Sequence, residues 1–233
     1  MLIKFGGGVI DARGSIGGNT FSRSRFGNYA RARTTPINPR SSRQAAIRAA
    51  MMILSEQWRE SPMDNSKRAA WELYASSVSW TNKLGEVVNL TGFNHFMRSN
   101  MALLYTNGSI VTAGPTDFSL PGSDETATFT YTTGAKLDLV YDDTAAWCDE
   151  DDAWFIIDAG IPKNNSVNFF DGPWRYFFRV GGNSITPPTS PATGQIWPWI
   201  PAIGNKLWLR VSIIRADGRM SSKHVLAPFT VVA

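Results

Sequence analysis

The chain has 233 residues, of which 43% are hydrophobic, and its nine Trp and thirteen Phe can fill a folded core, which excludes a disordered protein. One cysteine, Cys148, excludes an internal disulfide, and the longest apolar run, Ala49–Leu54, is too short to cross a bilayer. The net charge of +4 conceals a gradient: residues 1–50 carry nine basic residues and one acidic residue, whereas residues 114–233 carry nine and thirteen. Such asymmetry indicates attachment to a partner.

The N-terminal part is predicted to be an extended basic arm over residues 1–38. Between Arg13 and Arg48 the chain is rich in Gly, Ser, Asn and Arg, has no acidic residue and shows no regular apolar period before Pro39. A segment of this composition cannot bury a face of its own. We therefore expect it to lie against a partner, either neighbouring subunits or nucleic acid.

Residues 39–113 are predicted to form a small helical bundle that begins with a helix hairpin. Asn38 and Pro39 have the residue types of a helix N-cap and first helical position. The first helix ends at Glu60–Pro62, and Ser61 or Asp64 caps the second after a short connection. Their apolar stripes are Ile47, Met51, Leu54 and Trp58, then Ala70, Trp71, Tyr74 and Val78.

A third helix is predicted to begin at the cap Thr91 and to end at Asn107-Gly108, after a short strand or extended link at Glu86–Leu90. Its large apolar residues recur at helical spacing. The aromatic residues of all three helices are interpreted as core rather than as a binding platform.

Residues 114–233 are predicted to form an antiparallel β-sandwich. Apolar or alternating runs separated by Gly, Pro, Asn and Asp define six strands: Thr126–Thr133, Lys136–Tyr141, Ala153–Ala159, Trp174–Val180, Leu207–Ile214 and Ala227–Val232. In the fifth strand Leu207, Leu209, Val211 and Ile213 share one face. Asp217-Gly218 then supplies a hairpin turn into the last strand. This segment resembles the final hairpin of fibronectin type III and other immunoglobulin-like modules, so the predicted class is α+β.

The sequence does not predict an enzyme, a cofactor or a metal site. The two histidines, His95 and His224, fall in different predicted domains, and no nucleophile signature or phosphate-binding loop is present. An acidic group could gather a cation such as Ca²⁺, but its spacing is not that of an EF-hand, and a solvated loop is the favoured interpretation. That group is Asp142, Asp143, Asp149, Glu150, Asp151 and Asp152.

The predicted partner-binding residues combine arginines with aromatic rings. Arginines two residues apart would line one side of an extended segment, which suits a nucleic-acid backbone or the carboxylates and apolar pockets of a protein. We favour a protein partner. The residues are Arg13, Phe21, Arg23, Arg25, Phe26, Tyr29, Arg31, Arg33, Arg40 and Arg43.

The order of these features resembles a group of uncharacterised virion structural proteins of tailed phages. The resemblance rests on the Gly/Arg arm, on Asn38, Pro39, Gln44 and Arg48, on the Trp-containing hairpin and on Thr91–Asn100. It implies a virion component assembled in the host cytoplasm, most simply a capsid-associated decoration or cement protein. The implied partners are the major capsid protein or further copies of the chain in a homo-oligomer, with no membrane. A head–tail connector or tail protein, and a nucleic-acid-binding protein, remain as alternatives.

Overall fold

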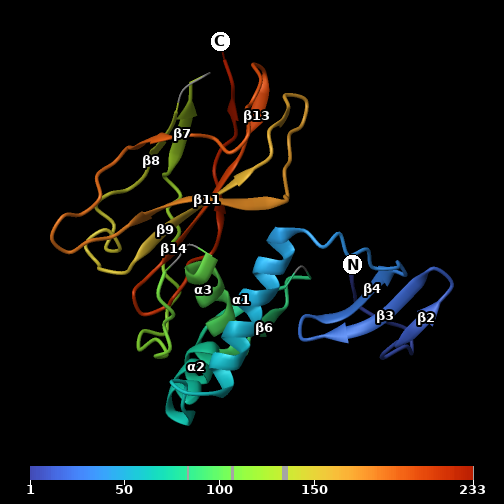
Figure 1. Ribbon diagram of the computed structural model, residues 1–233. Coiled ribbons are helices and arrows are strands. Elements are labelled where there is room, and N and C mark those ends of the chain that lie inside the picture. Colours follow the sequence, from blue (N-terminus) through green and yellow to red (C-terminus); the bar gives the residue numbers. More distant parts are fainter. Residues whose placement is uncertain (83, 106–107, 133–135, 233) are drawn as a thin grey trace. The chain divides into compact units, whose positions relative to one another are not determined.

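The computed structural model describes residues 1–82, 84–105, 108–132 and 136–232. Within these residues it has three helices, and every strand pair is antiparallel, so the fold is of the α+β class. The chain divides into two compact units, Met1–His95 and Phe96–Ala233, called unit 1 and unit 2 below. Figure 1 labels many of the elements of both.

The N-terminal segment is a folded sheet rather than the predicted unpaired arm. Four strands pair in the order β1-β4-β3-β2, and Figure 1 shows β2, β3 and β4 side by side. The prediction is wrong here because the glycines make tight turns: Gly17 (φ 57) joins β2 to β3 and Gly27 (φ 112) follows the β3–β4 turn. The strands are β1 (Leu2–Ile3), β2 (Gly14–Ile16), β3 (Asn19–Ser24) and β4 (Gly27–Ala32). Residues 33–41 form no helix or strand.

The first helix, α1 (Ser42–Arg59), begins later than predicted. Ser41 is its N-cap, and the Ser41 hydroxyl accepts a hydrogen bond from Gln44 N at 3.3 Å. Asn38 cannot be the cap because Arg40 has a left-handed backbone (φ 49), which interrupts the helix. The Asn38 side chain instead accepts a hydrogen bond from Arg40 N. The predicted end is confirmed, since Glu60 is the C-cap.

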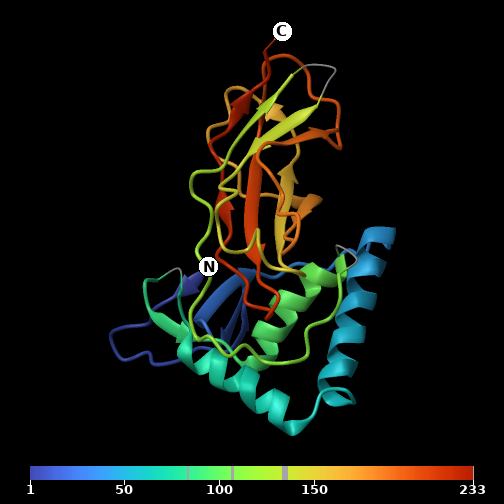
Figure 2. The same ribbon diagram turned by 90° about the vertical axis from the view of Figure 1, so that its left-hand side faces the viewer.

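The second and third helices are α2 (Asn65–Ser77) and α3 (Gly92–Tyr105). Asp64 rather than Ser61 caps α2, and the hydroxyl of Thr91 accepts from Asn94 N at 3.2 Å at the start of α3, as predicted. The predicted end of α3 falls at Asn107, which lies outside the described residues. Figure 2 shows α1 and α2 diverging from their joint, so they do not run antiparallel along their length as the hairpin prediction implied.

Ring packing closes the core of unit 1. Trp71 and Tyr74 of α2 are buried, Tyr74 meets the ring of His95 at 5.0 Å, and Trp58 of α1 meets Phe93 at 5.6 Å. The predicted core role of these aromatic residues is confirmed for the buried pair on α2. A hairpin of β5 (Ser79–Thr81) and β6 (Val87–Asn89) joins α2 to α3, so the predicted short strand near residue 88 is confirmed.

The cap of α2 predicts a pH-dependent stability of unit 1. Asp64 Oδ1 accepts from Lys67 N at 2.8 Å and from the Ser66 hydroxyl at 2.7 Å, and these bonds hold the pKa of Asp64 below its ordinary 3.8. A lowered folded-state pKa means that the carboxylate stabilises the fold above the ordinary value and loses this effect as pH falls through the lowered one.

We expect Asp64→Asn, which keeps a capping oxygen but cannot ionise, to be less stable than wild type near neutral pH and to approach it at about pH 2. Thermal unfolding at both pH values measures the difference. An equal gap at both pH values would contradict the role of the charge.

Unit 2 contains three small sheets. Their strand orders are β11-β9-β14-β15, β12-β8-β7 and β10-β13-β16. The strands are β7 (Thr128–Tyr131), β8 (Leu137–Val140), β9 (Trp154–Gly160), β10 (Lys163–Asn164), β11 (Trp174–Gly181), β12 (Ala192–Gln195), β13 (Asn205–Leu207), β14 (Leu209–Ile214), β15 (His224–Val225) and β16 (Phe229–Thr230). Each of the six predicted strands overlaps an observed one, although Thr133 of the first lies outside the described residues.

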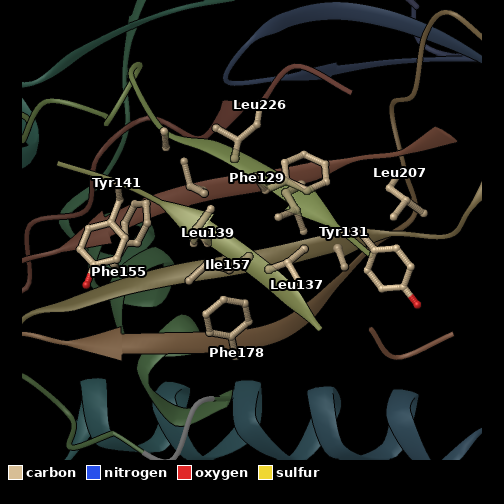
Figure 3. Packing of buried hydrophobic residues seen from close by; sticks show 14 of the residues in the cluster. Phe129, Tyr131, Leu137, Leu139, Tyr141, Phe155, Ile157, Phe178, Leu207 and Leu226 are labelled. Carbon is tan, nitrogen blue, oxygen red and sulfur yellow. The ribbon is translucent and has the colours of Figure 1, made fainter. Parts of the chain in front are cut away.

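One apolar cluster joins the sheets of unit 2 (Figure 3). It contains Phe129 of β7, Leu139 of β8 and Ile157 of β9, together with the buried thiol of Cys148. The predicted face of Leu207, Leu209, Val211 and Ile213 is confirmed, because all four are buried in this cluster. Burial, together with nearby carboxylates such as that of Asp143, raises the pKa of Cys148 to about 11.

The turn after β14 leads to a different strand from the one predicted. Gly218 has φ 86, as a tight turn requires, and the returning chain forms β15, which pairs with β14. The last strand, β16, pairs with β13 instead. In a second apolar cluster, Leu103 of α3 packs with Ile156 and Ile214 and covers part of the β9–β14 sheet. The larger part of α3 therefore belongs to unit 2, and the boundary between the units falls within this helix.

Candidate functional site

The predicted partner-binding residues all lie in unit 1, on and around the N-terminal sheet. Phe21 and Arg23 belong to β3, Arg25 and Phe26 form the β3–β4 turn, and Tyr29 and Arg31 belong to β4. Arg13 precedes β2 and Arg33 follows β4, whereas Arg40 and Arg43 lie next to and within the first turn of α1. The fold therefore gathers six of the ten on one hairpin.

The register of that hairpin places the arginines on both faces of the sheet, not on one side as predicted. Arg23 pairs with Asn28 and Arg31 pairs with Thr20, and residues on a strand alternate between faces. Arg23 thus shares a face with Phe21, and Arg31 shares the opposite face with Tyr29. The prediction treated the segment as one extended strand, and the turn at residues 25–26 reverses it.

The arginines give unit 1 a strong positive charge. Residues 1–95 carry thirteen Lys and Arg against six Asp and Glu, a net +7, while residues 96–233 carry ten against thirteen, a net −3. Arg13 pairs with Asp11 at 3.1 Å. In the described part of the chain, no carboxylate pairs with the exposed arginines of the hairpin and its ends: Arg23, Arg25, Arg31 and Arg33.

A largely apolar pocket of about 490 Å³ lies against the Tyr29 face of the sheet. Phe26, which is 40% exposed, and Tyr29 contribute their rings to it, and the β5–β6 hairpin closes one side with Thr81. The full lining is Met1, Leu2, Ser24, Phe26, Tyr29, Thr81 and Asn82. An apolar pocket on a positively charged unit is suited to a protein surface that offers carboxylates and apolar side chains.

Asn82 fixes this pocket and was not identified from the sequence. The buried amide donates to Phe26 O at 3.0 Å, and its carbonyl accepts from Leu84 N at 2.8 Å and Glu86 N at 2.9 Å. It holds the β3–β4 turn against the β5–β6 hairpin across 56 residues of sequence. The sequence around Asn82 indicates only a turn and does not predict a contact with a residue so far away in the chain.

We expect Asn82→Ala to destabilise unit 1 by about 1–2 kcal/mol, because it removes part-buried hydrogen bonds to the backbone of Phe26, Leu84 and Glu86. Urea unfolding measures this change. The matched control is Asn89→Ala, which removes a single exposed hydrogen bond to Ser76 O. Equal effects of the two substitutions would contradict the bracing role of Asn82.

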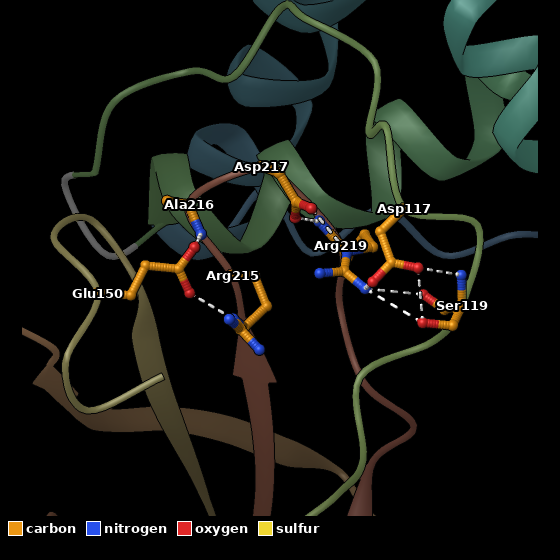
Figure 4. A network of polar contacts seen from close by, with 7 residues as sticks. All are labelled: Asp117, Ser119, Glu150, Arg215, Ala216, Asp217 and Arg219. Atoms are coloured by element: carbon orange, nitrogen blue, oxygen red, sulfur yellow. Dashed lines mark hydrogen bonds and ion pairs between the residues drawn. The ribbon is translucent and has the colours of Figure 1, made fainter. Parts of the chain in front are cut away.

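The acidic group of unit 2 is largely used in local hydrogen bonds. Thr144 lowers the pKa of Asp142, and Ser184 lowers the pKa of Asp151, because hydroxyl and backbone N–H groups donate to the carboxylates. Glu150 forms an ion pair with Arg215 (Figure 4). Within the described residues, no group of three or more His, Cys, Asp or Glu is arranged to hold a metal ion.

Arg219 is the centre of a second polar network in unit 2 (Figure 4). The side chain is only 9% exposed, donates to Asp217 at 2.6 Å and pairs with Asp117. It also donates to the backbone and hydroxyl of Ser119. The network ties the segment before β7 to the turn after β14, which is a structural role.

The two histidines lie in different units. His95 is buried and accepts a hydrogen bond from Trp80 Nε1 at 3.4 Å, while His224 belongs to β15. Among the described residues, no helix has the length and apolar character needed to span a membrane.

No protein-family model and no curated protein matches the chain. Among solved structures, it is similar to the twitchin kinase region from C. elegans (Fn31-NL-kin-CRD-Ig26), with 11% identity and a TM-score of 0.32. The match covers 49% of this chain and 17% of that chain. A likeness at this level supports no argument about fold or function.

Proposed function

We propose that the chain is a structural protein of a tailed-phage virion, a decoration or cement subunit that attaches to the capsid through unit 1. The observation that carries the proposal is the N-terminal sheet itself. It carries an apolar pocket lined by Phe26 and Tyr29 and, distributed over both faces, four exposed arginines for which the described residues supply no carboxylate partner, on a unit with a net charge of +7. Such a surface is complementary to an acidic protein surface with apolar side chains.

We further propose that unit 2 is an immunoglobulin-like sandwich of the fibronectin type III kind. The strand order supports it. If β7, β8 and β12 are strands A, B and E, and β9, β11, β14 and β15 are C, C′, F and G, the two main sheets read E-B-A and C′-C-F-G. The shared apolar cluster of these sheets also suits a sandwich.

The first test is the copy number of the chain in purified virions, measured by quantitative mass spectrometry against the major capsid protein. A count comparable to that of the capsid protein supports a shell decoration. A small count that fits one symmetric ring would move the protein to the neck or tail. Absence from virions would overturn both virion roles.

The attachment surface is tested by replacing Arg23, Arg25, Arg31 and Arg33 with Gln. We expect the variant to fold, because these side chains are exposed. When it is added to particles made without the wild-type protein, we expect it to fill few of the binding sites. Lys136→Gln with Arg175→Gln, which removes exposed cations from unit 2, is the control. Full occupancy by the four-residue variant would contradict attachment through this sheet.

The same four arginines favour one alternative, the binding of nucleic acid. If each arginine contacts one phosphate of a single strand, the logarithm of the association constant should fall linearly with the logarithm of the salt concentration, with a slope of about −3. Filter binding over a range of salt concentrations measures it. Placement of the arginines on both faces of the sheet is unfavourable for one strand, and a flat salt response would exclude this alternative.

A further inference from the structure

Helix α1 leaves several large apolar side chains uncovered. Leu54 is its one buried residue among those described, whereas Met51, Met52 and Ile53 are 48%, 59% and 43% exposed. A surface helix normally pairs one apolar stripe with a polar opposite face. On α1 the side away from Leu54 carries Met52 with the exposed small residues Ala45 and Ala49, so this side has the composition of a contact surface.

Two charges on this side, those of Arg48 and Glu56, are placed symmetrically about Met52, and Arg59 lies on the same side seven residues after Met52. Arg48 lies four residues before it and Glu56 four residues after it, so the three form one ridge along the helix. Both charged side chains are exposed. The small side chains of Ala45 and Ala49 beside the ridge allow a second helix to approach closely.

We propose that α1 binds α1 of a second copy of the chain, antiparallel and with the two-fold axis at Met52. In this register each Arg48 lies opposite Glu56 of the other copy, so the contact contains two identical ion pairs around a central Met52 contact. A parallel arrangement would place like charges together, and insertion into a lipid surface would bury Glu56 without a partner. The inference does not depend on the proposed virion role.

Sedimentation velocity of the full chain over a range of concentrations tests the interface. We expect a reversible dimer, and Met52→Lys should raise its Kd by roughly tenfold or more. Leu73→Lys on α2 is the control, because Leu73 is 55% exposed and outside the proposed contact. A wild-type chain that stays monomeric, or equal effects of the two substitutions, would overturn the proposal.

Charge exchange tests the register. Arg48→Glu and Glu56→Arg should each weaken the homodimer, because each creates two like-charged pairs. Combining both substitutions in one chain should restore it, and mixing the two single variants should give a heterodimer. Neither rescue follows from a local effect, such as the loss of the 3.4 Å contact between Arg48 and Asn38. Failure of both rescues would overturn the antiparallel register. It would not bear on the proposed virion role, which is tested separately by the occupancy of particles.

Discussion

Replacing Gly182 with alanine is expected to destabilise unit 2 by about 3 kcal/mol, because two backbone carbonyls occupy the space of the added methyl group. An ideal Cβ at this position would lie 2.1 Å from Trp147 O and 2.5 Å from Glu150 O. Gly182 N also donates to Ala153 O at 2.9 Å, which limits how far the segment can move away. Urea unfolding followed by tryptophan fluorescence measures the loss.

The matched control for this substitution is Gly122→Ala in the same unit. No atom lies within 4 Å of a Cβ built at Gly122, and its backbone is not in the left-handed region. We therefore expect its unfolding midpoint to stay within error of wild type. If Gly122→Ala and Gly182→Ala had the same urea midpoint, the close approach at Gly182 would not limit the stability of unit 2.

Leu139→Ala is expected to cost about 2–5 kcal/mol, since it removes three carbon atoms from the centre of the shared cluster and leaves a cavity. Leu139 is fully buried in β8 and pairs with Phe129 of β7 and with Ala192 of β12. The neighbouring Val140 points the other way and is 47% exposed, so Val140→Ala is the control. Equal losses would mean that the two sheets do not share this core.

Periodicity predicted the regular parts of the fold because it reports directly which side of an element is buried. Leu209, Val211 and Ile213 alternate with smaller or polar residues, and all three are buried as expected. The N-terminal sheet gave no such signal. Its strands bury few side chains completely, and Phe21 and Tyr29 are only half-buried, so turns and backbone pairing rather than apolar alternation define it.

The candidate site was predicted in composition but not in geometry. The sequence identified Arg23, Arg31, Phe26 and Tyr29, but their distribution over two faces follows from the register, which depends on where the chain turns. Asn82 could not be found in this way, because its contact with the Phe26 carbonyl links segments distant in sequence. The sequence predicted one apolar stripe for α1 and did not identify the outward side around Met52. Met51 of that predicted stripe is half-exposed, so the core prediction is wrong for this residue.

The burial of Cys148 means that chemical labelling of its thiol can report when unit 2 opens. With its pKa raised to about 11, the thiol is almost entirely protonated near neutral pH. Alkylating reagents react with the thiolate, so labelling of the folded chain should be slow and should proceed through transient opening. Because the chain has one cysteine, the rate of mass increase, divided by the alkylation rate of the unfolded chain, reports that opening without an engineered labelling site.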